Sequence, residues 1–192
     1  MATRGRKPLS GETAEERKKK VLDTFLKTLM TNGLCETSVR DLSGSIDLQS
    51  GGLYYYYENK DEAVVACAEE AALRLENELI VKSLKDIDDI ELLMKNLRKR
   101  ASKMAPMTRF LVEVSTTPRY AKRIRPVLDR FSERYKYYNQ IFADKLECSK
   151  EELEPYFYMA ITAVSSYMIF GVLEYIQPQI DLIVSFVNGL KK

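Results

Sequence analysis

The segment from Thr37 to Lys60 holds the residues whose types and spacing most clearly suggest chemistry. It carries two adjacent glycines, Gly51 and Gly52, and then four consecutive tyrosines, Tyr54 to Tyr57. Glycine lets a backbone approach a phosphate group closely, and the amide groups at a helix N-terminus attract anions. The tyrosines supply both packing surface and hydroxyl donors. The sequence therefore predicts that this segment contacts phosphate groups.

Two short helices around a tight turn must position these residues. Thr37 or Ser38 can cap the first helix, which carries three apolar residues, and Asp41 lies near its positive end. After Asp47 a third short segment covers about residues 49–56. Size and order are typical of a helix-turn-helix, in which the second helix enters the major groove of DNA.

The segment resembles the DNA-binding signature of the tetracycline-repressor (TetR) family, and the resemblance covers about residues 13–80. The matching residues are Thr37, Ser38, Val39, Leu42, Gly51, Leu53, Tyr54, Tyr56, Asn59 and Lys60. The residues that depart from the signature are Ser43, Ile46, Asp47, Gln49 and Gly52. Aspartate tolerates the left-handed region well enough to make the turn, and the Gln49 amide can reach a base edge.

The resemblance implies an all-α protein with an N-terminal three-helix helix-turn-helix DNA-binding domain and a larger C-terminal helical domain for ligand binding and dimerisation. It implies a transcriptional regulator, in the first instance a repressor, that leaves a palindromic operator when a small apolar or amphipathic ligand binds. Leu53 and Tyr57 are then core residues. The resemblance implies DNA contacts by Gln49, Ser50, Gly51, Gly52, Tyr54, Tyr55, Tyr56 and Lys60, and the basic residues Arg4, Arg6 and Arg40 are further candidates.

The expected organisation is a basic flexible arm over residues 1–12, a DNA-binding domain over 13–60 with its helix-turn-helix at about 37–56, and a C-terminal domain over 61–192. Arginines are drawn into the narrow, negative minor groove of A·T-rich DNA, which makes the arm a candidate minor-groove hook. A solvated tail is the alternative. A homodimer on an inverted repeat is expected, because one short helix reads few bases.

Composition excludes several classes of function. There is no histidine, so triads, general bases and metal sites that need it are excluded. The three cysteines, Cys35, Cys67 and Cys148, are far apart in the sequence, which favours free thiols in a reducing cytosol. The sequence shows no nucleophile and base pair, no metal-ligand spacing and no phosphate loop. It therefore predicts a cytoplasmic protein with no enzymatic activity, no metal and no cofactor.

The stretch 155–173 holds no charged residue for about the length of a bilayer core. Acidic residues precede it, and Thr162, Ser165 and Ser166 lower its hydropathy, whereas a membrane span prefers basic flanks. A subunit interface also requires a helix that is apolar on both faces. We therefore expect no membrane partner. A membrane-associated helical protein and a DNA-binding regulator without a small-molecule inducer stay as alternatives.

Hydrophobic periodicity predicts helices along the whole chain. Thr13 with Glu16, Asn59 with Glu62, and Ser149 with Glu152 are helix-capping pairs. Gly33 is expected to end the first helix, and Pro106 is expected to break another. The helices expected after the helix-turn-helix cover about residues 59–79, 86–104, 106–116, 118–146, 150–175 and 179–190.

Bulky apolar residues in the C-terminal domain are more numerous than a tight core needs, and thioethers and phenols adapt to ligands. We expect a ligand pocket between the 86–104, 106–116, 118–146 and 150–175 helices, with an ordinary core as the alternative. The candidate pocket residues are Met104, Met107, Phe110, Glu113, Val114, Tyr120, Tyr138, Phe142, Tyr156 and Met159. Glu113 is the candidate partner for a cationic ligand, unless it faces solvent.

The last two helices are expected to form the dimer interface as a four-helix bundle across the two-fold axis. One stripe of the 150–175 helix is expected to make this contact, and other residues of the helix are expected to face the subunit core. The expected interface residues are Leu153, Phe157, Ala160, Ile161, Val164, Met168 and Gly171.

Overall fold

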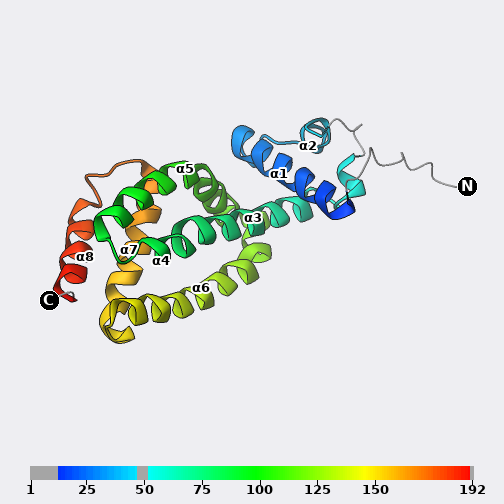
Figure 1. Ribbon diagram of the computed structural model, residues 1–192. Coiled ribbons are helices and arrows are strands. Elements are labelled where there is room, and N and C mark those ends of the chain that lie inside the picture. The colour runs from blue at the N-terminus through cyan, green and yellow to red at the C-terminus, as the bar shows by residue number, and fades with distance from the viewer. Residues whose placement is uncertain (1–12, 47–51, 191–192) are drawn as a thin grey trace, which may run out of the picture. The chain divides into compact units, whose positions relative to one another are not determined.

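The computed structural model of the chain describes residues 13–46 and 52–190, and every regular element in these ranges is helical. The all-α prediction is therefore confirmed for this part of the chain. The protein divides into two compact units, Met1–Cys67 and Ala68–Lys192, called here the N-terminal unit and the C-terminal unit. Figure 1 follows the elements of both units along the chain.

The first helix of the N-terminal unit is α1, Ala14–Asn32. It begins with the predicted capping box, in which the Glu16 backbone N–H donates to Thr13 Oγ1 at 3.2 Å and the Thr13 N–H donates to Glu16 Oε2 at 2.8 Å. It ends at Gly33, whose φ of +88° lies in the region that favours glycine. Its buried face carries the predicted apolar stripe, which includes Phe25 and Leu29.

Three further elements follow α1 along the chain. They are α2, Val39–Gly44; the 3₁₀ turn η1, Gly52–Tyr55; and α3, Lys60–Glu76. A helix was predicted over about 49–56, and the described portion of it is the single turn η1. Residues 47–51 lie outside the described part of the chain, as do residues 1–12, where the basic arm was predicted.

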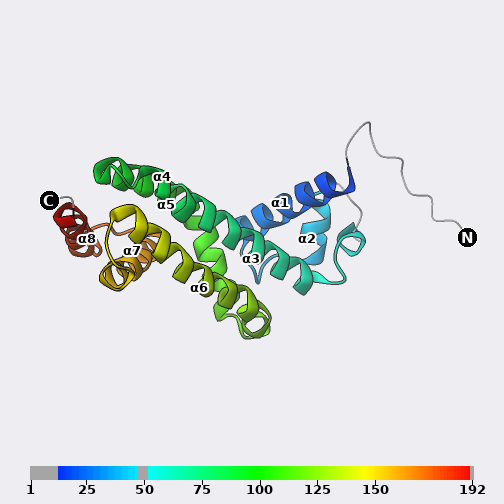
Figure 2. The same cartoon turned by 60° about the horizontal axis from the view of Figure 1, so that its bottom comes forward.

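The C-terminal unit contains a π-helical turn and five α-helices after the end of α3. These elements are η2, Asn77–Val81; α4, Ser83–Asp86; α5, Ile90–Thr116; α6, Pro118–Leu146; α7, Lys150–Phe170; and α8, Gln177–Leu190. The long helices α5, α6 and α7 pack on one another, and α8 packs on α7. Both views show α8 beside α7 (Figure 1, Figure 2).

The prediction that Pro106 breaks a helix is wrong, because α5 continues through it to Thr116. A proline removes one backbone hydrogen bond from a helix interior. The helix is nevertheless kept, since it buries Ala101, Met104, Phe110 and Val114 on both sides of the proline. The start of this helix also differs from the prediction.

Asp89 caps α5, so the helix begins at Ile90 and not near residue 86. The Asp89 side chain accepts a hydrogen bond from the Leu92 N–H at 3.0 Å. The preceding residues form the separate turn α4, in which Asp86 pairs with Arg100 and accepts a hydrogen bond from Asn96 at 3.1 Å. These two contacts tie α4 to α5.

The predicted 150–175 helix is shorter in the structure, because α7 ends at Phe170. Gly171, which has a φ of +75°, caps it and donates its N–H to the Tyr167 carbonyl at 2.8 Å. The last helix begins at Gln177 and contains Pro178 in its first turn, where the missing N–H costs no helical hydrogen bond. Among the helices of the described ranges, none has the length and hydropathy needed to cross a bilayer.

Candidate functional site

Leu53 anchors η1 to α2 in the N-terminal unit. Its side chain is fully buried, as predicted, and its backbone N–H donates to Ser43 Oγ at 3.2 Å. Ser43 is itself fully buried. A buried hydroxyl requires a hydrogen-bond partner, and the Leu53 amide provides one. The serine that departs from the TetR signature therefore forms a specific link between the two elements.

The four tyrosines after Leu53 differ in exposure. Tyr54 and Tyr55 are 58% and 81% exposed, and the Tyr55 ring meets the Tyr56 ring edge-on at 4.9 Å. Tyr57 is half-buried, and its ring centroid lies 5.9 Å from that of Phe25 on α1. Burial, assisted by the nearby Cys67 thiol, raises the pKa of Tyr57 to about 12. Tyr57 therefore packs on the core side of η1, and Tyr54 and Tyr55 face solvent.

A capping box holds the start of α2. The Ser38 N–H donates to Asp41 Oδ2 at 2.7 Å, and the Asp41 N–H donates to Ser38 Oγ at 3.1 Å. These contacts with Ser38, with smaller contributions from the Arg40 and Lys60 charges, lower the pKa of Asp41. Arg40 is exposed on the same turn. The cap therefore fixes the first turn of α2, which carries Arg40.

Lys60 stands at the first position of α3, and its ammonium donates to the Leu34 carbonyl at 3.0 Å. The sequence suggested a phosphate contact for this residue. The structure adds an internal role, because the hydrogen bond joins α3 to the loop that follows α1. An ammonium has three N–H donors, so the carbonyl occupies one and leaves capacity for a further acceptor.

Lys60→Met is therefore expected to lower the free energy of unfolding by about 1 kcal/mol, because the charged hydrogen bond from Lys60 to the Leu34 carbonyl is lost. Thermal denaturation followed by circular dichroism measures the change. Lys27→Met is the matched control, since Lys27 is exposed on α1 of the same unit. Equal melting temperatures for the two variants would contradict the internal role of Lys60.

The remaining candidate DNA-binding residues lie partly inside and partly outside the described part of the chain. Gly52 is the first residue of η1, and Tyr56, which directly follows η1, is partly buried. Residues outside the described part of the chain are Arg4, Arg6, Gln49, Ser50 and Gly51.

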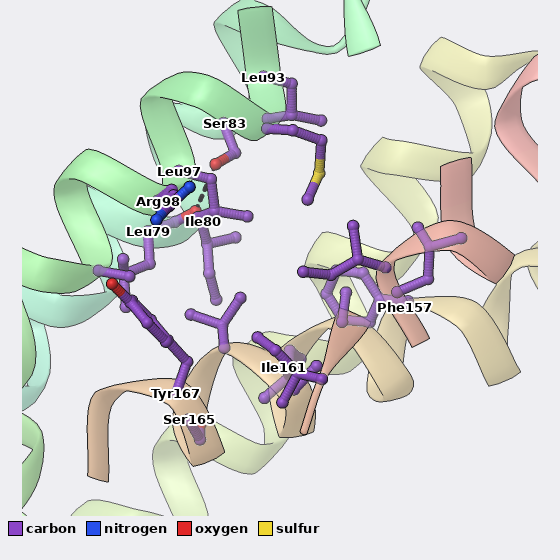
Figure 3. A pocket seen from close by; sticks show the side chains of 18 of the residues that line it. Leu79, Ile80, Ser83, Leu93, Leu97, Arg98, Phe157, Ile161, Ser165 and Tyr167 are labelled. Carbon is purple, nitrogen blue, oxygen red and sulfur yellow. Dashed lines mark hydrogen bonds between the residues drawn. The ribbon is translucent and has the colours of Figure 1, made fainter. Parts of the chain in front are cut away.

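The C-terminal unit contains an apolar cavity with a volume of about 630 Å³. Its lining comes from the end of α3, from η2 and α4, and from α5, α6, α7 and α8. Figure 3 shows Ile80, Leu93, Phe157 and Ile161 around the open centre. Binding sites for small molecules are typically mostly apolar and of this volume, with a small number of polar groups.

Two of the predicted pocket residues, Phe142 and Tyr156, line this cavity. The structure does not bring the other eight to its wall. Buried residues outside the lining are Met104, Phe110, Val114, Tyr120 and Tyr138, and partly buried residues outside the lining are Met107, Glu113 and Met159. Sequence reasoning missed the aliphatic wall formed by Leu79, Leu93 and Leu97, although the helical stripe of α5 was a signal for part of it.

The predicted interface stripe of α7 also lies at the cavity. Six of its seven residues line the cavity wall, and Leu153, Phe157 and Met168 are buried within their own subunit. The seventh, Gly171, caps the helix. Helical periodicity identifies an apolar face but not the element that lies against it, and most of this face borders the cavity that α5, α6 and α8 also line.

A buried carboxylate borders the same cavity. Glu76 is 3% exposed, and its Oε1 atom accepts hydrogen bonds from the Tyr138 hydroxyl and from Arg134, the latter at 2.6 Å. Burial and the hydrogen bond to Glu76 raise the pKa of Tyr138. The guanidinium compensates the negative charge of Glu76, so this pair adds little net charge to the cavity wall.

Comparison with known proteins identifies a shared fold but does not identify a family. No family model matches the chain, and no curated protein of similar sequence was found. Among solved structures, the chain is similar to a crystal structure of a candidate transcriptional regulator from Pseudomonas aeruginosa PAO1, with a TM-score of 0.59 and 13% sequence identity. The similarity covers 94% of this chain and 93% of that chain. The two proteins therefore share their fold over nearly the whole length.

Proposed function

We propose that the protein is a DNA-binding transcriptional regulator of the TetR type, a repressor that leaves its operator when a small ligand binds. The contrast within η1 carries the proposal. Leu53 is fully buried, whereas Tyr54 and Tyr55 next to it are 58% and 81% exposed. Two exposed phenols held by a buried anchor form a surface suited to phosphate and base contacts. The shared fold with a protein described as a candidate transcriptional regulator supports the same function.

The double variant Tyr54→Ala and Tyr55→Ala tests this surface. Two lost polar contacts, at about 1 kcal/mol each, correspond to roughly a 30-fold loss of affinity. Fluorescence anisotropy on a duplex selected from a randomised pool measures it. Tyr137→Ala is the control, because Tyr137 is 65% exposed on α6 in the other unit. Unchanged affinity in the double variant would refute the assignment of η1 to DNA.

A homodimer is part of the proposal, since two recognition elements double the sequence that one short helix reads. The end of α7, the segment that follows it and α8 each carry a large exposed apolar side chain. Phe170, Tyr175 and Leu182 are 69%, 72% and 50% exposed. Large apolar side chains that are exposed to solvent favour association with a second copy. We therefore propose that these three residues contribute to the two-fold contact, in place of the stripe that lines the cavity.

Phe170→Arg combined with Leu182→Arg is expected to give a monomer that no longer binds operator DNA at micromolar concentration, because each arginine must be desolvated at the contact. Light scattering after size-exclusion chromatography measures the mass. Tyr137→Arg, on α6, should stay dimeric. A double variant that keeps the dimer mass would place the contact elsewhere.

The cavity of the C-terminal unit is the proposed ligand site. A ligand releases DNA only if it binds the DNA-free form more tightly than the DNA-bound form. A regulator without a small-molecule inducer is the second candidate. The apolar cavity of about 630 Å³ favours the inducible form, because an ordinary core is packed without voids of this size.

A further inference from the structure

The apolar cavity has a basic side. Lys95 and Arg98 are the two cationic residues in its lining, and both are exposed on α5. They are three residues apart, so they lie on the same face of the helix. Apolar residues form most of the remaining wall.

Within the described ranges, neither Lys95 nor Arg98 forms an ion pair with a carboxylate. The carboxylate in the cavity wall, that of Glu76, already pairs with Arg134. The positive charges of Lys95 and Arg98 are therefore uncompensated by a carboxylate of this wall. A ligand anion would supply the missing negative charge.

A hydrogen-bonded group extends the basic side. The Ser102 and Tyr167 hydroxyls lie 3.0 Å apart, and Tyr167 lines the cavity. The hydrogen bond with Ser102, followed by one with Arg98, lowers the pKa of Tyr167. Figure 3 shows Arg98 and Tyr167 on one side of the cavity, beside Leu79 and Leu97, with Phe157 on the opposite side. The cation and the phenol therefore lie together at one side of a mostly apolar cavity, which suits an amphipathic ligand.

We propose that the cavity binds an amphipathic anion, a single alkyl chain that ends in a carboxylate. The alkyl chain occupies the apolar centre, and the carboxylate pairs with Arg98, with Lys95 and the Tyr167 hydroxyl beside it. A guanidinium matches the geometry of a carboxylate and binds it through two parallel hydrogen bonds. This inference names the ligand class for the cavity of the proposed function and rests on that assignment.

An alkyl amine is the competing ligand, with Glu76 as its partner. The Oε2 atom of Glu76 accepts no hydrogen bond from the described residues. The carboxylate is already paired with Arg134, however, and it is almost fully buried. The uncompensated cations therefore favour the anion.

The test compares dodecanoate, dodecanol and dodecylamine, which share one alkyl chain and differ in charge. Calorimetric titration of the full chain, below the aggregation concentration of each probe, gives the affinities. We expect dodecanoate to bind about tenfold more tightly than dodecanol, as one partly exposed charged pair provides. Added salt should reduce this difference, because it screens the exposed cations.

Arg98→Gln should remove the preference for dodecanoate, and Lys95→Gln should reduce it. Lys99→Gln is the matched control, because Lys99 is exposed one residue further along α5 and lies outside the lining. Tightest binding of dodecylamine would overturn the proposal, as would an undiminished preference in Arg98→Gln or no binding of any probe. The salt dependence of the wild-type protein tests the same charge pairing without a substitution.

Operator binding is measured separately, so the two proposals can fail independently. Dodecanoate binding that leaves operator affinity unchanged would support the ligand class and refute ligand-controlled release. Operator binding by a protein that binds none of the probes would refute the ligand class and leave the DNA-binding function supported.

Discussion

Phe25→Ala is expected to destabilise the N-terminal unit strongly, so that it unfolds at a lower temperature than the rest of the protein, and to weaken DNA binding. Phe25 is fully buried on α1, and its ring packs against Tyr57 after η1. Replacing a buried phenylalanine by alanine removes about 3 to 5 kcal/mol of stability, through lost transfer free energy and the cavity left behind. A small unit has about 5 to 15 kcal/mol in total, so the loss is a large fraction of it.

Circular dichroism on heating should show an early transition in this variant that the wild-type protein lacks. Tyr137→Ala, which removes an exposed ring, should melt as the wild type does. The cavity lies in the C-terminal unit, so Phe25→Ala should keep its affinity for dodecanoate at temperatures below the main transition. If Phe25→Ala bound DNA normally and melted without an early transition, the described packing of α1 would be wrong.

The second large effect is expected from Ala160→Phe, which places a ring in the ligand cavity. Ala160 lies on α7, is partly buried and belongs to the cavity wall. A bound ligand and the new ring would compete for the same volume, and overpacking of this kind costs about 1 to 3 kcal/mol. Ligand affinity should therefore fall about ten- to hundredfold. Operator affinity should be kept, so the variant should repress without responding to ligand.

Calorimetric titration with dodecanoate and anisotropy on operator DNA measure the two properties on the same preparation. Ser132→Phe adds the same ring at an exposed position of α6 outside this cavity, and it should leave ligand affinity unchanged. Undiminished ligand binding by a folded Ala160→Phe protein would show that the ligand binds elsewhere.

Local features of the sequence predicted the helices well where side chains near in sequence decide the structure. The capping pairs of Thr13 with Glu16 and of Ser149 with Glu152 are both present, and each marks the start of a helix. Their physical cause lies within one turn, since each side chain satisfies a backbone N–H three residues away. Leu53 was also assigned correctly to the core.

Features that depend on packing between distant segments were predicted less well. Pro106 carries a strong local signal for a break, but burial along α5 outweighs it. The apolar stripe of α7 was predicted from its periodicity, but its place at the cavity wall was not, because periodicity does not reveal which element covers a face. The cavity could not be separated from an ordinary core for the same reason, as the volume between Leu93 on α5 and Ile161 on α7 depends on where the helices lie.

The most direct test of the account is the binding of the full chain to a duplex selected from a randomised pool, measured at several salt concentrations with the stoichiometry determined. We predict an inverted-repeat site bound by two protomers, with log affinity falling linearly with log salt concentration by about 0.9 for each phosphate contact. The Tyr54→Ala and Tyr55→Ala variant should bind the same site more weakly. Failure to select any sequence, or binding that neither depends on salt nor responds to this variant, would contradict the assignment of the protein as a DNA-binding regulator.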